Sequence, residues 1–347
     1  YELCSVFNVS GMSRGALSAP AVLALSRGVA RAGGYMSTGE GGLAPEHLAG
    51  GADIAFQIGT AKYGCRDDAG NLDEERLRAI AAHPTVKMIE VKLAQGAKPG
   101  KGGLLPGVKV TAEIAAIRGI PVGQDSVSPN RHRDIGNVRE LGDFIDRVRR
   151  VSGKPVIVKF VVGDEQFLDE WFADCVARPA GCPDAVQVDG GEGGTGAAPA
   201  PLAEHVGLPI TQALPMVVAA LGRHRLRERV AVIASGKLIT PDKVAWALCL
   251  GATAASSARG PMFALGCIQS LKCETGNCPT GVTAARPWFV HGLDPTDKSV
   301  RVAAYLARVR AEVEMIAHAC GLAEPSAFAP RHVTEVEAGI AGFRAGA

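Results

Sequence analysis

Short apolar runs alternate with helical patterns along the whole chain, and this alternation constrains the fold more than any other feature. Eight runs are predicted as strands, at residues 6–10, 55–58, 86–93, 125–128, 156–161, 185–188, 230–234 and 252–256. Helices are predicted at residues 19–31, 73–82, 111–118, 138–151, 241–250 and 300–320. Strands that alternate with helices in this way favour a parallel sheet.

Glycine-rich loops follow many of these strands, and their distribution separates two parallel-sheet architectures. A doubly wound open sheet, the second alternative, usually carries one dominant glycine-rich turn after its first strand. Here such loops follow early and late strands alike, which favours an α/β fold of the (β/α)8 TIM-barrel type. No repeat or long linker divides the 347 residues, so we expect one domain over 1–347.

Composition excludes several classes of partner. The formal net charge of +2 gives no support for a nucleic-acid or anionic membrane partner. No apolar run is long enough to span a bilayer. Nine cysteines is an odd number in a chain long enough to fold without disulfides, so we expect a reducing, cytoplasmic location.

Two loops near the end of the strand series have the composition of a phosphate site. Residues 235–237 (SGK) and 256–260 (SSARG) follow the presumed seventh and eighth strands. TIM barrels commonly bind phosphate at this position through backbone N–H groups. Lys237 and Arg259 can balance the charge of the phosphate. Either loop alone is as easily an ordinary turn, but two after consecutive strands favour phosphate.

The glycine-rich segment 190–199 (GGEGGTGAAP) is a candidate anion-binding nest, with Thr195 as a placed hydroxyl. A flexible loop is the alternative. Lys159 lies inside a strand of valines, where a charge is costly unless it is paired or used. It either points into the barrel mouth beside a cofactor or extends its ammonium to solvent.

Lys98 and Lys101 lie in the loop 96–106, which contains Pro99 and Pro106 and follows a predicted strand. A lysine there points at the barrel mouth, where it can bind a carboxylate or a carbonyl. Glu40, His132 and Asp134 are weaker acid/base candidates, because single loop residues of these types are more often structural.

Three cysteines, Cys267, Cys273 and Cys278, are separated by five and four residues, with Pro279 directly after the last. Thiolates favour iron–sulfur clusters, zinc and Cu(I), and a run that ends in Cys-Pro is typical of iron–sulfur ligation. Zinc is less favoured, because a structural site needs four ligands, usually in CxxC pairs. Unrelated buried thiols are the remaining alternative, but this loop is polar and free cysteines usually lie in apolar segments.

Five segments resemble, in order, the FMN-binding synthase domain of glutamate synthase. They are GMSRGALS (11–18), STGEGG (37–42), VKLAQGAKPGKGGLLPG (91–107), VDGGEGGTGAAP (188–199) and the cysteine run. The likeness covers nearly the whole chain, and AQGAKPG with the cysteine run is its most specific part. SGKL, SARGPMFALGCIQ and CPTGV look most like stand-alone bacterial members that lack the glutaminase domain.

The resemblance implies a role for each matching residue. A [3Fe–4S] cluster, which needs only three thiolates, would be held by Cys267, Cys273 and Cys278. Lys98 and Glu40 would be catalytic, and Arg118 would lie near the substrate. The residues that would surround FMN are Met12, Ser13, Gln57, Lys92, Lys159, Gly194, Thr195, Gly236, Lys237, Ser257 and Arg259.

One departure from the family pattern concerns the substrate pocket. The usual motif reads KPGEGGQLPG, whereas here Lys101 and Leu104 replace the glutamate and the glutamine. Leu104 cannot make the polar contact that the glutamine makes to an oxo-acid. We therefore expect Leu104 to be a substrate-binding position with changed specificity.

The resemblance implies an oxidoreductase that reduces 2-iminoglutarate, formed from 2-oxoglutarate and ammonia, to L-glutamate. Electrons would come from a ferredoxin or an NAD(P)H-oxidising flavoprotein, and ammonia would be free or supplied by a partner amidotransferase. The alternatives are an N-methylglutamate synthase-type enzyme acting on another amine, and a non-catalytic electron-transfer subunit. A homo-oligomer is compatible with each of these functions.

Within the single domain we expect an iron–sulfur loop at 263–285 and a C-terminal helical extension at 296–347. No GxGxxG fingerprint follows a predicted strand, so direct nicotinamide binding has no support.

Overall fold

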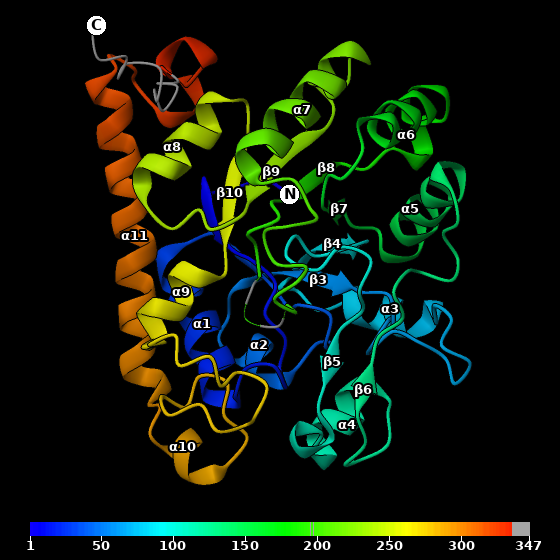
Figure 1. The fold of residues 1–347 in the computed structure, drawn as a ribbon, viewed down its shortest axis with the longest axis vertical. Helices are drawn as coiled ribbons and strands as arrows, with labels where there is room; N and C mark the ends of the chain where they lie inside the picture. Colours follow the sequence, from blue (N-terminus) through cyan, green and yellow to red (C-terminus); the bar gives the residue numbers. More distant parts are fainter. Residues whose placement is uncertain (195, 197, 335–347) are drawn as a thin grey trace, which may run out of the picture.

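Eight parallel strands close into a barrel in the computed structural model, which describes residues 1–194, 196 and 198–334 (Figure 1). The strands are β1 (Phe7–Val9), β2 (Tyr35–Ser37), β3 (Asp53–Ile58), β4 (Val86–Lys92), β7 (Val156–Phe160), β8 (Ala185–Asp189), β9 (Ala231–Ser235) and β10 (Ala254–Ser257). Because β10 pairs with β1, the sheet has no open edge among these strands. The predicted (β/α)8 barrel is confirmed, and the open sheet is excluded.

Helices surround the barrel and alternate with its strands (Figure 1). They are α1 (Ala19–Ala32), α2 (Pro45–Ala49), α3 (Glu74–Ala81), α5 (Val138–Ser152), α6 (Glu165–Ala177), α7 (Ile210–Arg223), α8 (Pro241–Cys249), α9 (Arg259–Leu265), α10 (Pro287–His291) and α11 (Pro295–Ala319). The predicted helix at 300–320 is therefore the larger part of α11. No helix in the described ranges is both long and apolar enough to cross a membrane.

The predicted strand at 125–128 is wrong as a barrel strand. Its centre forms β6 (Ser126–Val127), which pairs antiparallel with β5 (Leu104–Leu105) outside the barrel. The missing barrel strand is β2, which escaped prediction because it has only three residues between glycine-containing turns. The wrong strand at 125–128 and the missed strand β2 cancel, so the expected number of eight barrel strands is correct although one of the eight was misassigned.

The segment 104–127 forms an arm between β4 and β7 that projects beyond the barrel (Figure 1). Besides β5 and β6 it contains α4 (Ala112–Arg118), the helix predicted at 111–118, whose first turn is capped by the Thr111 hydroxyl. The arm has a small hydrophobic core of its own, formed by Leu105, Val110, Ile114 and Ala115 with Ile120 against it. This arm carries several side chains into the site described below.

Helix α11 runs along α1 and also contacts α8 and α9 (Figure 1). The approach to α1 is close, since a Cβ on Gly28 would lie 2.5 Å from Cγ1 of Val302. Only glycine fits at such a crossing. The helix therefore covers the side of the barrel where β10 meets β1.

The interior of the barrel changes character between two successive layers of side chains. Six residues at the amino-terminal side form a separate apolar cluster: Tyr35, Ala55, Met88, Ile157, Ala185 and Ile233. Side chains two residues apart on a strand point to the same face. Two positions further along each strand the buried residue is polar in every case: Ser37, Gln57, Glu90, Lys159, Gln187 and Ser235. The carboxyl end of the barrel is therefore a polar, buried floor.

His47 on α2 is a buried group that makes stability depend on pH. Its side chain is fully buried, and Nδ1 accepts the Ala44 N–H at 3.0 Å. Burial, with a further contribution from Arg14, lowers the pKa of His47 to about 4. Between about pH 6.5 and 4 the unfolded chain therefore binds a proton at His47, whereas the native state does not.

We predict that the free energy of unfolding falls as pH decreases from about 6.5 towards 4, with His47 contributing up to about 3 kcal/mol. His47→Gln should weaken this dependence when urea unfolding is measured at several pH values, and buried His132, whose pKa is also lowered to about 4, should supply the remainder. His291→Gln, at an exposed position of α10, is the control and should leave the profile unchanged. Identical profiles for His47→Gln and the parent protein would contradict the assignment.

Candidate functional site

A cavity of about 220 Å³ opens at the carboxyl ends of the barrel strands. It is lined by every predicted flavin, substrate and catalytic residue that the structure describes: Met12, Ser13, Glu40, Gln57, Lys92, Lys98, Leu104, Arg118, Lys159, Gly194, Gly236, Lys237, Ser257 and Arg259. Thr195 lies outside the described residues. Cys273 also lines the cavity, whereas Cys267 and Cys278 do not.

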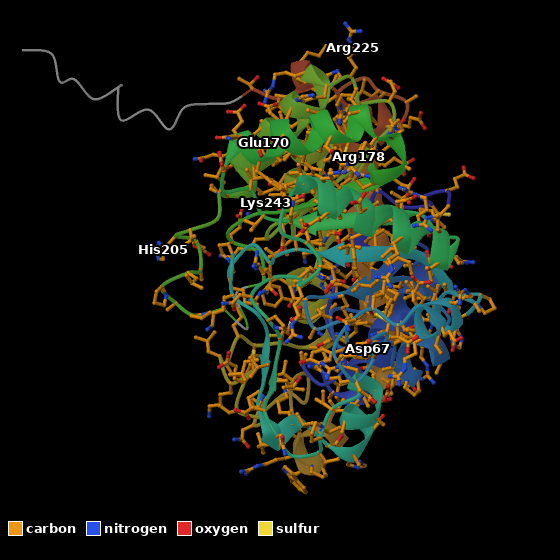
Figure 2. The ribbon with its side chains drawn as sticks, turned by 90° about the vertical axis from the view of Figure 1, so that its right-hand side faces the viewer. Asp67, Glu170, Arg178, His205, Arg225 and Lys243 are labelled. Atoms are coloured by element: carbon orange, nitrogen blue, oxygen red, sulfur yellow. The ribbon has the colours of Figure 1, made fainter. Side chains whose placement is uncertain are left out.

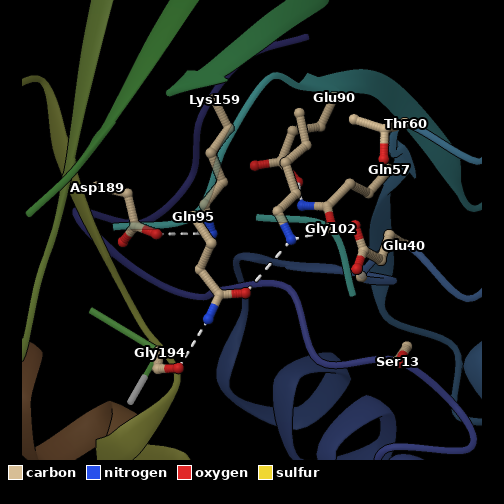
Figure 3. Close-up of polar contacts among 12 residues, drawn as sticks. Ser13, Glu40, Gln57, Thr60, Glu90, Gln95, Gly102, Lys159, Asp189 and Gly194 are labelled. Atoms are coloured by element: carbon tan, nitrogen blue, oxygen red, sulfur yellow. Dashed lines mark hydrogen bonds and ion pairs between the residues drawn. The ribbon is translucent and has the colours of Figure 1, made fainter. Parts of the chain in front are cut away.

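Lys159 of β7 and Asp189 of β8 form an ion pair at the floor of the cavity, with 3.3 Å between Nζ and Oδ2 (Figure 3). Asp189 also accepts the Gly96 N–H at 2.9 Å and the hydroxyl of Ser235. Burial alone would lower the pKa of Lys159, but the Asp189 carboxylate outweighs it and the pKa is raised. Lys159 is therefore a fixed cation rather than a solvated one.

Glu90 of β4 organises the neighbouring part of the polar floor. Its Oε2 accepts the Ser37 hydroxyl at 2.5 Å and the Gln57 side-chain amide at 2.6 Å, while Oε1 has no partner among the described residues. Because Gln57 donates its N–H to Glu90, its amide oxygen is left to face the cavity as an acceptor. The predicted role of Gln57 thus depends on Glu90, which the sequence analysis did not single out.

Lys92 at the end of β4 links two sides of the cavity. Its ammonium lies 3.2 Å from Oε2 of Glu40 and 3.3 Å from Oε1 of Gln95, and Gln95 donates to the Gly194 carbonyl at 2.7 Å (Figure 3). Burial opposes ionisation of Glu40, but Lys92, Lys98 and Arg118 outweigh it and its pKa is lowered. Glu40 is therefore a carboxylate, which can accept a proton but holds none to donate.

Lys98 and Arg118 are buried cations without a carboxylate bound to them. Lys98 is 5% exposed, and its ammonium has no hydrogen bond or ion pair within the described part of the chain. Arg118 donates to the hydroxyls of Ser126 at 3.2 Å and Ser13 at 3.5 Å, and its guanidinium stacks 5.0 Å from the Tyr63 ring. Burial lowers the pKa of both groups. Buried charge of this kind is costly, and an anion in the cavity would offset that cost at these two side chains.

The loops after β9 and β10 form a tight backbone cradle on the opposite side. Gly236, after β9, has φ +139°, and a Cβ there would lie 3.2 Å from the nitrogen of Gly190, so the loops after β8 and β9 touch through their backbones. Lys237 pairs with Glu204, and the Arg259 guanidinium lies 6.0 Å from the Phe263 ring centroid. Without a side chain at Gly236 a ligand can approach the backbone of this loop closely, whereas the Gly190 N–H is already donated to the Ser235 carbonyl at 2.8 Å.

The cysteine loop, residues 266–285, follows α9 and packs beside the cavity. All three of its thiols are free, and Cys278 is buried with its Sγ 3.4 Å from the Thr280 hydroxyl. Burial raises the pKa of Cys278, but hydrogen bonds from Thr280 and Thr283 outweigh this and lower it. Within the described residues no three Cys, His, Asp or Glu side chains are gathered closely enough to hold a metal ion. The cluster therefore stays a prediction.

Lys109 is a buried residue of the site that sequence reasoning missed. It is 5% exposed at the end of a 3₁₀ turn in the arm, and its ammonium donates to the carbonyls of Ala16, Cys273 and Thr283. Burial lowers its pKa to about 8, although the nearby Cys273 and Cys278 act in the opposite direction. The sequence around Lys109 does not predict its burial, because GVKV on a loop is typical of a solvated lysine.

His132 and Asp134 do not line the cavity. His132 donates through Nε2 to the Lys92 carbonyl at 2.9 Å, and burial lowers its pKa to about 4. Asp134 pairs with the buried Lys62 at 3.1 Å. Both residues support the site from behind, which agrees with their low rank as acid/base candidates. Lys101 lines only a small adjoining cavity of about 10 Å³.

Comparison with known protein families gives a match over most of the chain. The family model described as the conserved region in glutamate synthase matches residues 1–323. The glutamate synthase large subunit-like protein YerD of Bacillus subtilis is 44% identical over 325 residues, which are 93% of this chain and 62% of that protein. The archaeal glutamate synthase (NADPH) of Methanocaldococcus jannaschii is 38% identical, over 90% of this chain and 58% of that protein. The chain thus spans about three-fifths of the length of these two relatives.

Solved structures share the fold at low sequence identity. A flavocytochrome b2 variant with sulfite bound superposes with a TM-score of 0.58 at 15% identity, covering 95% of this chain and 70% of that one. A mandelate oxidase variant gives a TM-score of 0.54 at 17% identity, covering 92% and 75% of the two chains. These likenesses concern the barrel alone.

We predict that Lys159 and Asp189 are coupled strongly. Asp189→Asn or Lys159→Met should each cost about 3–5 kcal/mol, because either leaves its partner buried without a counter-charge. The double variant should lose at least about 2 kcal/mol less than the two single losses combined. Urea denaturation of the four proteins measures this coupling.

The exposed pair Arg308 and Glu312 on α11 supplies the control. The same cycle with Arg308→Gln and Glu312→Gln should give a coupling below about 1 kcal/mol. A Lys159–Asp189 coupling energy no larger than that would show that Asp189 does not fix the Lys159 ammonium at the floor of the cavity.

Proposed function

The chain belongs to the family defined by the conserved region of glutamate synthase, and from that premise we propose that it is an FMN-dependent oxidoreductase of the glutamate synthase type. The observation that carries the proposal is the division of one cavity into two ends. A backbone cradle after β9 and β10 lies at one end. Buried cations without bound carboxylates, Lys98 and Arg118, lie at the other.

The residues present fit FMN. The cradle at Gly194, Gly236, Lys237, Ser257 and Arg259 offers backbone N–H groups and positive charge for the ribityl phosphate. The chemistry that FMN supplies when bound is hydride delivery to an imine carbon. Met12, Ser13, Gln57, Lys92 and Lys159 would line the ring system.

Lys159 would contribute a fixed positive charge at the ring. Because Asp189 holds the ammonium at the floor, Lys159 cannot turn away to solvent. A preorganised cation stabilises negative charge that develops on a bound ring without reorganisation. Gln57, oriented by Glu90, would present its oxygen to a ring N–H.

At the other end, Lys98 and Arg118 would bind the carboxylates of 2-oxoglutarate or of the imine formed with ammonia. A guanidinium can hold a carboxylate through two parallel hydrogen bonds. Glu40, ionised and paired with Lys92, would accept a proton from the incoming amine or order its N–H groups. The product of this arrangement is L-glutamate.

Cys267, Cys273 and Cys278 would hold a [3Fe–4S] cluster that receives electrons from an external donor. The donor set supports this, since three free thiols lie on one loop and one of them reaches the cavity. The donor would be a ferredoxin or an NAD(P)H-oxidising flavoprotein, and a partner amidotransferase could supply ammonia. A cytoplasmic setting would keep the thiols reduced.

Leu104 favours a second candidate, an enzyme of the N-methylglutamate synthase type. This side chain lines the cavity although it is 56% exposed, and Leu105, Pro106 and Met12 add apolar surface to the same wall. An alkyl substituent on the amine would bury against Leu104, whereas ammonia gains nothing there. The two candidate functions therefore differ in the amine that the enzyme uses, ammonia or an alkylamine.

We predict that the purified protein is yellow and that its chemically reduced flavin is reoxidised anaerobically by 2-oxoglutarate with an ammonium salt. Faster reoxidation with methylamine would support the second candidate. Arg118→Met should slow reoxidation at least about 100-fold at limiting oxo-acid, because it removes the carboxylate receptor. Arg131→Met, at an exposed position, is the control. A colourless protein contradicts the proposal, and a flavoprotein inert to every amine supports a non-catalytic electron carrier.

We predict further that Cys273→Ser removes most of the iron and acid-labile sulfide while leaving the FMN content unchanged. The thiolate is the ligand, and a serine hydroxyl is a poor substitute for it. Elemental analysis and absorbance spectra of anaerobically purified protein measure both groups. Cys320→Ser, at an exposed position away from the loop, should change neither. Equal iron in Cys273→Ser and the parent protein would disprove the ligand assignment.

A further inference from the structure

Lys109 uses its entire hydrogen-bonding capacity on three backbone carbonyls from two separate segments. A lysine ammonium has three donors, and here they go to the carbonyls of Ala16 at 2.9 Å, Thr283 at 3.0 Å and Cys273 at 3.2 Å. Ala16 belongs to the loop after β1, and the other two belong to the cysteine loop. The arm is thereby connected to both segments through a single side chain.

The stem of Lys109 packs against the cysteine loop as well. A Cβ on Gly276 would lie 3.9 Å from Cγ of Lys109, and Gly276 itself has φ +72°. On its far side the loop meets the glycine-rich segment, since a Cβ on Gly196 would lie 3.9 Å from the Cys273 Sγ. Cys273 is thus held between Lys109 and a segment that borders the cavity.

The charge of Lys109 is not neutralised by a directly bound carboxylate. No ion pair involves this ammonium within residues 1–194, 196 and 198–334, and its three partners are neutral carbonyls. The ammonium lies 3.2 Å from the Cys273 carbonyl oxygen, so this cation lies beside the loop that carries the Cys273 and Cys278 thiols. An uncompensated buried cation stabilises negative charge on such neighbours.

We propose that Lys109 is a positioning residue for the cysteine loop, holding Cys273 at the cavity and stabilising negative charge that collects on the Cys273 and Cys278 thiolates. The first part depends on the hydrogen bonds alone. The second rests on the proposed function, in which these thiolates hold a redox cluster. Hydrogen bonds and net charge around cluster sulfurs are established determinants of reduction potential.

Two substitutions separate position from charge. Lys109→Met keeps the stem and removes both the hydrogen bonds and the charge. Lys109→Arg keeps the charge, but its planar fork cannot direct three donors at three converging carbonyls. Lys243→Met, at an exposed position of α8 (Figure 2), is the matched control. All proteins are purified anaerobically with their bound cofactors.

Hydrogen exchange measured by mass spectrometry tests position. Peptides covering 273–285 should exchange at least about tenfold faster in Lys109→Met than in the parent protein, with barrel-strand peptides unchanged. Lys109→Arg should show a smaller increase in the same peptides. Parent-like exchange in both variants would overturn the positioning role, and this readout holds whether or not iron is present.

An EPR-monitored redox titration tests charge. Lys109→Met should make one-electron reduction of the cluster about tenfold less favourable, which corresponds to about 59 mV, while Lys109→Arg should match the parent protein. An equal shift in both variants, or in neither, would overturn the charge role. If Lys109→Met fails to fold, faster exchange with an unshifted potential in Lys109→Arg supports the proposal and a shifted potential contradicts it. A parent protein without iron disproves the proposed cluster and the charge role together. The hydrogen-exchange measurement then still tests whether Lys109 positions the cysteine loop.

Discussion

Burial of charge inside the barrel is the constraint on which the rest of this structure depends. The apolar layer of Tyr35, Ile157 and Ile233 gives way, two residues along, to a layer in which every inward side chain is polar. Such a layer is stable only if its members satisfy one another. The Lys159–Asp189 pair and the Oε2 atom of Glu90 do this within the strands themselves, while Oε1 of Glu90 has no partner among the described residues. The floor of the cavity is therefore as rigid as the barrel that forms it.

The cavity above this floor is built by loops of different kinds. Glycine backbones that touch, such as Gly190 and Gly236, make the cradle: a Cβ on Gly190 would lie 2.6 Å from the Ile210 nitrogen, and Gly236 has φ +139°, which other residues rarely adopt. Long buried cations, Lys98 and Arg118, make the anion receptor, and they come from the excursion between β4 and β7. In the proposed function, backbone contacts would recognise the phosphate, whereas side chains would set the identity of the substrate. The two tasks are thus separated along the chain.

Strand periodicity and glycine clusters are local signals, and they predicted the barrel and the loops 235–237 and 256–260 that border the cavity, whereas most of the other cavity residues were expected from the family resemblance. It failed where structure depends on pairing at a distance. Strand β2 has only three residues and is defined by its neighbours, and the run at 125–128 has a strand's composition but no place in the barrel. Lys109 and Glu90 were missed because nothing near them in sequence reveals three carbonyls or two donors.

The arm at 104–127 has a small core of its own, separate from that of the barrel. A segment with its own core can detach without melting the remainder, so its opening has a free energy distinct from that of global unfolding. Arg118 reaches the cavity from this arm, and a bound dianion would add its binding energy to the closed form alone. Occupancy of the pocket and protection of the arm against proteolysis therefore become two measurements of one equilibrium.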